Sequence, residues 1–246
     1  MIVYSNSEYI QLQDLSIELD NRAFNYGDGF FETVKIINSN AFNFSVHYLR
    51  IIESCSILSL DFNYTEKELS KVIETILIKN NIINGTVKLH FSRDSRGKYL
   101  PVSSKVNLLI VSDKGLGFQL NKAISLCFYK EEIKTKSKIS TIKSCNALVS
   151  VLSSIYARGN NFDNAILFNT DANVIECSNS NIFIVKEDII YTPPVRDGCV
   201  SGTIRGWVLN NETVIEKSLS EKEILNADEI FTTNAINGIV SVNKVG

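Results

Sequence analysis

Three short segments of this 246-residue sequence hold residue types that could do chemistry. Lys143 stands directly ahead of an expected helix, and a lysine amine shielded from water there has a lowered pKa, which suits a Schiff-base amine. Glu176 ends an apolar strand, so its carboxylate must meet a cation or a hydrogen-bond donor, or lie exposed at the strand end. Ser201-Gly202-Thr203-Ile204 leads into a helix whose first N–H groups can bind an anion or a phosphate. Each segment also has a plain structural interpretation: a solvated lysine, a paired or exposed acid, and an ordinary N-cap.

Histidine, cysteine and metal chemistry have little support in the sequence. It contains two histidines and five cysteines, and the closest two cysteines, Cys127 and Cys145, are 18 residues apart. No C-x-x-C pair is therefore available for zinc or thiol exchange, and we predict no metal site. The G-x-S-x-G, H-E-x-x-H, G-x-x-x-x-G-K-[ST] and G-x-G-x-x-G motifs are missing as well. We interpret His47 and His90 as structural residues.

The composition limits which partners and which cellular compartment we expect for the protein. The formal net charge is −2, which removes the general electrostatic argument for nucleic acid or an anionic membrane as the main partner. No apolar run approaches the ~20 residues of a membrane span, and Met1–Ile10 is too polar for a signal peptide. Scattered, unpaired cysteines are typical of a reducing compartment. We therefore expect a soluble cytoplasmic protein.

The elements that must position these residues alternate between strands and helices in the first half of the chain. Phe30–Ile37 has a β-rich composition, and Val106–Val111 is typical of a buried strand. Thr65 to Glu68 has the spacing of a capping box, which predicts a helix after it. Ser45–Leu60 has helical spacing, with two broad faces: Val46, Leu49, Ile52 and Leu58 on one, His47, Arg50 and Ser54 on the other.

Two lobes are expected, residues 1–113 and 114–246, because the glycines in Asp113–Gly117 interrupt strand-like sequence on both sides. A helix is predicted from about Ser144 to Arg158, and short strands separated by Asn/Asp-rich turns follow it. The expected fold class is mixed α and β (α+β). The N-terminal lobe is α/β, and the C-terminal lobe is rich in short strands, as in a compact barrel or paired sheets.

Five segments in a fixed order carry a resemblance to a known family. They are Tyr26–Thr33 (YGDGFFET), His47–Arg50 (HYLR), Thr141–Leu148 (TIKSCNAL), Glu176–Phe183 (ECSNSNIF) and Ser201–Arg205 (SGTIR). Together they resemble the motifs of the fold-type IV, pyridoxal-phosphate-dependent class IV aminotransferases. That family includes D-amino acid transaminases, branched-chain aminotransferases and aminodeoxychorismate lyases. The resemblance spans about Leu19 to Val242 and implies the D-amino acid aminotransferase-like fold, with a pseudo-barrel as the C-terminal lobe.

The resemblance implies that the protein holds pyridoxal 5'-phosphate. Lys143 would hold the cofactor as an internal aldimine and then carry the proton between the substrate Cα and the cofactor C4′. Glu176 would hydrogen-bond the pyridine nitrogen and keep it protonated, which preserves the electron sink. The implied phosphate contacts are the Arg50 guanidinium, the N–H groups of Thr203 and Ile204 with the Thr203 hydroxyl, and Asn234.

Substrate recognition follows the family less closely. Phe31 and Thr33 would approach the substrate side of the pocket. The loop after Val87–Phe91 lacks the histidine of the R-x-H pair of D-amino acid transaminases, and the tyrosine–valine–asparagine run of branched-chain enzymes is also missing after the lysine. Three basic residues of that loop are candidates for binding the substrate carboxylate, weighed evenly against a solvated surface loop: Arg93, Arg96 and Lys98. The family pattern further implies a homodimer, with the active site between the lobes and near the subunit interface.

Three functions are therefore weighed. The leading one is transfer of an amino group between an amino acid and a 2-oxo acid. The alternative is the 4-amino-4-deoxychorismate lyase reaction, a β-elimination of pyruvate that gives 4-aminobenzoate and needs the same lysine and electron sink. The short chain keeps that alternative open. The third is a binding protein without cofactor on the same scaffold. Loss of Lys143, Glu176 or Arg50 would be its signature, and all three are present.

Overall fold

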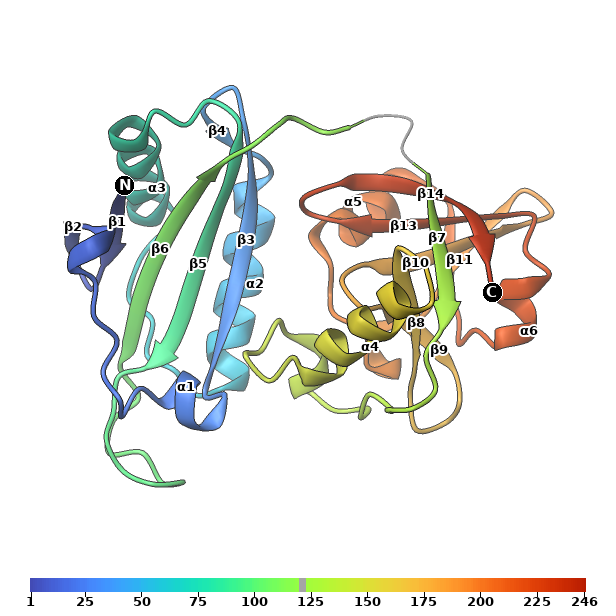
Figure 1. Cartoon of the computed structure of the whole chain (residues 1–246), viewed down its shortest axis with the longest axis horizontal. Coiled ribbons are helices and arrows are strands. Elements are labelled where there is room, and N and C mark those ends of the chain that lie inside the picture. The colour runs from blue at the N-terminus through green and yellow to red at the C-terminus, as the bar shows by residue number, and fades with distance from the viewer. Residues whose placement is uncertain (120–122) are drawn as a thin grey trace. The chain divides into compact units, whose positions relative to one another are not determined.

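Two β-sheets organise the residues that the computed structural model describes, 1–119 and 123–246 (Figure 1). The mixed α and β fold class expected from the sequence is thereby confirmed. By internal contacts the chain divides into two units: a first unit of Met1–Gly117 with Lys143–Asn146, and a second of Phe118–Ile142 with Ala147–Gly246. The sequence-based division after residue 113 stays a prediction of domain organisation.

The first unit is built on a sheet whose order is β2-β1-β6-β5-β3-β4, with all neighbouring strands antiparallel. Its strands are β1 (Ile2–Ser5), β2 (Glu8–Gln11), β3 (Gly29–Ile37), β4 (Asn40–Ala41), β5 (Gly85–Arg93) and β6 (Val106–Lys114). The three long strands β3, β5 and β6 form the centre of this sheet. Gly29–Ile36 of β3 pairs residue by residue with Gly85–Ser92 of β5, and β5 pairs in the same way with β6.

Helices α2 (Phe44–Ile57) and α3 (Glu66–Asn80) cover one face of this sheet and enclose the core of the first unit (Figure 1). The predicted capping box of α3 is confirmed. The Glu68 N–H donates to the Thr65 hydroxyl at 3.3 Å, and the Thr65 N–H donates to the Glu68 carboxylate at 2.8 Å. Two short elements precede β3: the 3-10 turn Leu12–Asp14 and α1 (Arg22–Tyr26).

The buried face of α2 combines polar and apolar side chains, and it is not the apolar face expected from the sequence. His47 and Arg50 are buried together with Ile51, whereas Leu49 is 67% exposed. The polar part of this face meets Glu32, a fully buried carboxylate on β3 that pairs with both His47 and Arg50. A carboxylate buried in that position requires charged or hydrogen-bonding partners, so His47 and Arg50 face the sheet.

The second unit is built on a larger sheet of order β12-β11-β10-β13-β14-β7-β8-β9. Four neighbouring pairs are antiparallel and three are parallel, namely β11 with β12 and β7 with both β14 and β8. The strands are β7 (Ala123–Phe128), β8 (Asn164–Phe168), β9 (Val174–Cys177), β10 (Asn181–Lys186), β11 (Ile189–Thr192), β12 (Val214–Glu216), β13 (Glu229–Asn234) and β14 (Gly238–Val245). This confirms the strand-rich character expected for the C-terminal part of the chain.

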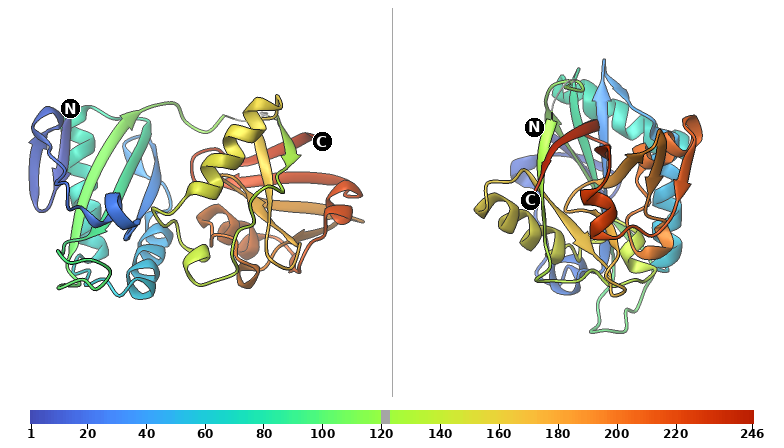
Figure 2. Two further views of the ribbon diagram at one scale, coloured as in Figure 1. Left: turned by 60° about the horizontal axis from the view of Figure 1, so that its bottom comes forward. Right: turned by 90° about the vertical axis from the view of Figure 1, so that its right-hand side faces the viewer.

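Alternate residues of β7 and β8 point into two separate cores. Leu126 and Ile166 belong to one core, and Cys127 and Leu167 belong to the other, which α4 (Leu148–Gly159) packs against (Figure 2). The remaining helical elements are α5 (Thr203–Asn211), α6 (Glu221–Leu225) and the 3-10 turns Ile139–Thr141 and Val195–Asp197. Among residues 1–119 and 123–246, none of the helices has the length and apolar character that crossing a membrane requires.

The predicted helix from about Ser144 begins later than expected, at Leu148. Residues just after Lys143 are instead extended and pair with β3. The Phe31 N–H donates to the Lys143 carbonyl at 3.0 Å, and the Cys145 N–H donates to the Gly29 carbonyl at 2.9 Å. This pairing satisfies backbone groups that a helix would have used differently. It also places Lys143 on the edge of β3 rather than at a helix N-terminus.

Candidate active site

The Lys143 amine lies over an aromatic side chain of the first sheet. Its Nζ is 4.8 Å from the centre of the Phe31 ring, on the sheet face opposite the buried Glu32. Thr33 shares that face because it lies two residues further along β3. The structure therefore brings together Lys143, Phe31 and Thr33, three of the residues predicted to act on cofactor and substrate.

A second lysine on the same ring was missed by the sequence analysis. Lys88 Nζ is 4.7 Å from the centre of the Phe31 ring, and Lys88 is the direct cross-strand partner of Thr33. Its neighbour His90 faces Phe31, and burial together with the Lys88 charge lowers the pKa of His90 to about 4. His90 is therefore neutral at physiological pH. No sequence motif marked Lys88, because its position follows only from the β3–β5 register.

Arg50 is held as a planar fork, although its observed partner is a carboxylate. Its Nε donates to one Glu32 oxygen at 2.6 Å and its Nη2 to the other at 2.7 Å, while His47 Nδ1 lies 2.8 Å from Glu32 Oε2. Burial alone would raise the pKa of Glu32. The Arg50 charge and the hydrogen bonds from His47 and Arg50 outweigh it and hold the pKa at about 2. Glu32 therefore orients Arg50, whose role as a phosphate contact stays a prediction.

Arg93, predicted to bind a substrate carboxylate, is buried in a structural network. Its Nε donates to Asp28 at 2.9 Å, and its Nη atoms donate to the Ser59 carbonyl at 3.0 Å and the Leu58 carbonyl at 2.6 Å. Arg22 contacts the same Asp28 oxygen at 2.7 Å. Burial acts to raise the pKa of Asp28, but Arg93 and Arg22 together keep it below its ordinary value.

The other two basic residues of this loop, Arg96 and Lys98, are exposed. Arg96 Nε is 3.7 Å from Asp20 in an ion pair that lies open to solvent. Exposed pairs of this kind contribute little to stability. Nothing in the first unit ties either side chain to Phe31 or Lys143, so their part in substrate recognition stays a prediction.

We expect Arg93→Met to lower the free energy of unfolding by about 2–4 kcal/mol, because it leaves the Leu58 and Ser59 carbonyls and part of Asp28 without their donor. Urea denaturation measures this loss. Arg96→Met serves as the control, with an expected change within about 0.5 kcal/mol. Unchanged stability of Arg93→Met, together with a raised KM for an oxo acid, would instead assign Arg93 to the substrate.

Glu176, at the end of β9, has both kinds of partner that the sequence analysis required. Its Oε1 forms an ion pair with Lys134, and its Oε2 accepts a hydrogen bond from the Val200 N–H at 2.8 Å. Lys134 Nζ also donates to the Ser140 carbonyl at 2.9 Å. The sequence analysis missed Lys134. Its only signal is membership of a lysine-rich segment, 130–143, which does not indicate which of the five lysines pairs with a buried carboxylate.

At the N-terminus of α5, a glycine lets the backbone come close to neighbouring groups. The N-cap is Gly202, which provides no side-chain cap, and a Cβ on this glycine would lie 2.0 Å from Asn181 Oδ1. Thr203 and Ile204 follow in the first turn, where backbone N–H groups have no partner within the helix. The Thr203 hydroxyl is buried and, among the described residues, has no hydrogen-bond partner. A buried donor of this kind is expected to meet a ligand.

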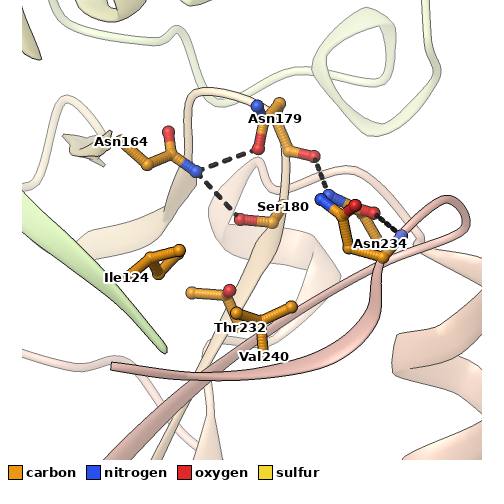
Figure 3. A pocket seen from close by; sticks show the side chains of 8 residues that line it. Ile124, Asn164, Asn179, Ser180, Thr232, Asn234 and Val240 are labelled. Carbon is orange, nitrogen blue, oxygen red and sulfur yellow. Dashed lines mark hydrogen bonds between the residues drawn. The ribbon is translucent and has the colours of Figure 1, made fainter. Parts of the chain in front are cut away.

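Asn234 uses its side chain to close the β13–β14 turn. Its Oδ1 accepts hydrogen bonds from the N–H groups of Ile236 at 3.0 Å and Asn237 at 2.8 Å, and its Nδ2 donates to the Asn179 carbonyl at 3.3 Å. It lines a small polar pocket with Asn179 and Ser180 (Figure 3). A phosphate contact through Asn234 stays a prediction. The neighbouring Thr233, which the sequence analysis did not single out, has a buried hydroxyl without a partner among the described residues.

Comparisons with known proteins agree on one family. The sequence profile described as amino-transferase class IV matches residues 29–245. A D-alanine aminotransferase from Staphylococcus epidermidis is 25% identical over 253 residues, covering 99% of this chain and 88% of its own length.

Solved structures agree as well. A branched-chain aminotransferase from Thermoproteus uzoniensis, crystallised with norvaline, matches with a TM-score of 0.92 at 23% identity, over 100% of this chain and 87% of its own. A putative 4-amino-4-deoxychorismate lyase from Legionella pneumophila matches with a TM-score of 0.88 at 26% identity, over 95% and 88%.

Proposed function

Since the chain belongs to the class IV aminotransferases, we propose that it binds pyridoxal 5'-phosphate and transfers an amino group between an amino acid and a 2-oxo acid. Enzymes of this family depend on that cofactor and act on amino acids and oxo acids. The observation that carries the proposal is the presence of three groups that the cofactor needs: the Lys143 amine beside β3, a buried carboxylate on β9 and the uncapped N-terminus of α5.

The residues present fit the cofactor. The phosphate requires N–H and O–H donors, and the first turn of α5 with the partnerless Thr203 hydroxyl supplies both. The pyridine nitrogen requires an acceptor, and the Glu176 carboxylate, held by Lys134 and the Val200 N–H, supplies one. The aldehyde requires an amine, which Lys143 provides.

Different residues of the chain would bind the cofactor and move the proton. When bound, the cofactor supplies an electron sink for the carbanion at the substrate Cα. Lys143 would anchor the cofactor and then hold or deliver the proton at that carbon. Glu176 would keep the pyridine nitrogen protonated. Arg50, Thr203 and Ile204 would bind the phosphate, with Asn234 as a further contact from the β13–β14 turn.

The 4-amino-4-deoxychorismate lyase reaction is the second candidate, and the match to the Legionella pneumophila structure supports it. Both reactions use the same lysine and electron sink. Arg96 and Lys98, like Phe31 and Thr33, are proposed substrate contacts in either case. Two carboxylates on aminodeoxychorismate would suit the basic loop as well as an amino acid would.

One assay separates the two reactions. Holoenzyme is incubated with L- and D-amino acids plus 2-oxoglutarate, and separately with aminodeoxychorismate and no oxo acid. An aminotransferase converts the first mixture to a new amino acid, whereas a lyase releases pyruvate from the second. Pyruvate release without any amino-group transfer would reject the leading proposal, and a protein that pyridoxal 5'-phosphate cannot reconstitute would reject both.

We also propose a homodimer and a cytoplasmic location. The dimer is supported by two exposed apolar stripes at helical spacing, one on α2 (Val46, Leu49, Ile52) and one on α4 (Leu148, Val151, Leu152, Ile155). A single-chain mass in sedimentation equilibrium would contradict the homodimer.

The cytoplasmic location is supported by five free cysteines, as in a reducing compartment. Fractionation that recovers the protein outside the cytoplasm would contradict that.

A further inference from the structure

The pair formed by Lys134 and Glu176 differs from the other ion pairs of the lysine-rich segment 130–143. The side chains of Lys134 and Glu176 are only 17% and 7% exposed. Two residues away, the side chains of Lys136 and its partner Asp171 are 40% and 54% exposed. A pair withdrawn from solvent is screened far less than a surface pair, so each partner strongly affects the charge of the other.

Lys134 is held in place by more than its charge. Its N–H donates to the Phe168 carbonyl at 3.0 Å, and the residue forms an isolated parallel bridge with Asn169. Its Nζ is tied to the Ser140 carbonyl at 2.9 Å as well as to Glu176. With the Val200 N–H at 2.8 Å on the other oxygen, the Glu176 carboxylate is fixed at both ends. It keeps further lone pairs for another donor.

The other charged groups around this pair have partners of their own. Arg205 donates to the Pro193 carbonyl at 3.0 Å and pairs with Glu216, while its buried Nε has no hydrogen-bond partner among the described residues. Asp197 accepts from the Ser218 hydroxyl at 2.6 Å and lies 3.9 Å from Lys136. The neighbouring thiols, those of Cys127, Cys177 and Cys199, have raised pKa values because they are buried, and so they stay neutral. Lys134 is the cation that the structure pairs with Glu176.

We infer that Lys134 is a positioning residue, which together with the Val200 N–H orients the Glu176 carboxylate so that it can accept the pyridine N–H of the cofactor. This inference rests on the proposed function. A carboxylate held away from solvent by a cation and a hydrogen-bond donor depends on both partners for its position. Without Lys134, one Glu176 oxygen would lose its partner, and the carboxylate could take orientations that do not meet the pyridine nitrogen.

The test compares Lys134→Met with Lys134→Arg, which keeps the charge, and with Lys130→Met, a lysine of the same segment whose pair with Glu221 is exposed. Each variant is studied as apoenzyme and with pyridoxal 5'-phosphate. If Lys134→Met does not fold, Lys134→Gln takes its place. The double variant Lys134→Met/Glu176→Gln removes the carboxylate whose orientation is inferred.

In the apoenzyme, the urea midpoint of Lys134→Met should fall below that of wild type, because the substitution leaves a buried carboxylate without its cation. In the holoenzyme, kcat of Lys134→Met should fall by about tenfold while KM for the amino acid stays within about twofold, because Lys134 acts through Glu176 and not on the substrate. The absorption band of the bound cofactor should shift in the same variant.

Lys134→Arg should restore the wild-type values, and Lys130→Met should leave them unchanged. In the Glu176→Gln background, Lys134→Met should cause no further loss of kcat. An unchanged kcat and an unchanged absorption band in Lys134→Met would overturn the inference. So would a loss of kcat that adds in full to that of Glu176→Gln, because it could not arise from Glu176. A wild-type protein that forms no cofactor band would overturn the proposed function and the role at the cofactor. The apoenzyme comparison reports separately on the contact between Lys134 and Glu176.

Discussion

Lys143→Ala is expected to abolish the visible absorption band of the bound cofactor and to lower turnover by at least about 10³-fold, because the proposal assigns to its amine both the covalent attachment of the cofactor and the proton transfer at the substrate Cα. Stability should change little, since the Lys143 backbone pairing with Phe31 survives the substitution. Absorption spectra and single-turnover assays of the reconstituted protein measure both effects.

Lys88→Ala is the matched control, because Lys88 and Lys143 place their amines over the same Phe31 ring. If any cation on that ring sufficed, both variants would behave alike. The proposal requires the absorption band to survive in Lys88→Ala and to vanish in Lys143→Ala. A band that persists in Lys143→Ala and resists removal by dialysis would mean that a different amine holds the cofactor.

Glu176→Gln is expected to keep the cofactor bound while lowering kcat by about 10²–10³-fold, the usual cost of losing one preorganised electrostatic contact. The amide is close to isosteric with the carboxylate but cannot balance the charge of a protonated pyridine nitrogen. Proton abstraction should therefore become rate-limiting. A primary isotope effect with Cα-deuterated amino acid, larger in the variant than in wild type, measures this.

Glu221→Gln provides the control for Glu176→Gln. Glu221 also pairs with a lysine, Lys130, at 2.6 Å, but in an exposed position on α6. Its substitution should leave kcat within about twofold, because exposed pairs contribute little. If Glu176→Gln were equally mild, Glu176 would have no part in the chemistry and its burial with Lys134 would serve only the fold.

Local signals predicted the regular elements well. The capping box at Thr65 and Glu68 predicted the start of α3 because its two hydrogen bonds join residues three apart in the sequence. Glu176 was predicted to need a cation or a donor because charge burial is costly in any fold. The structure supplies both, through Lys134 and Val200.

The orientation of α2 could not be predicted from its own sequence. Hydrophobic periodicity places apolar residues such as Leu49 toward the core, yet His47 and Arg50 are buried instead. The deciding residue, Glu32, lies on a different element, and its burial follows from the strand alternation of β3. Periodicity measures apolar character alone and carries no information about a buried ion network.

The surroundings of Lys143 escaped prediction for a related reason. The sequence around it was compatible with a helix start, but its backbone groups pair with Gly29 and Phe31, more than a hundred residues away along the chain. Lys88 and Lys134 were missed because strand register and loop packing, rather than local motifs, bring them to Phe31 and Glu176. Tertiary pairing overrode local preference in each case.

The first unit contains Lys143–Asn146 in addition to Met1–Gly117, so cleaving the chain at one point does not separate the residues of the two units. A chain broken near Gly117 would give a first fragment that lacks the strand-like segment beside β3, while Lys143 would remain on the second fragment. The first fragment would therefore lack the backbone hydrogen bonds that Phe31 and Gly29 make with this segment. Any fragment complementation would have to rebuild the Phe31–Lys143 hydrogen bond between two molecules, so its success could be scored by whether the mixture regains the lysine-bound cofactor.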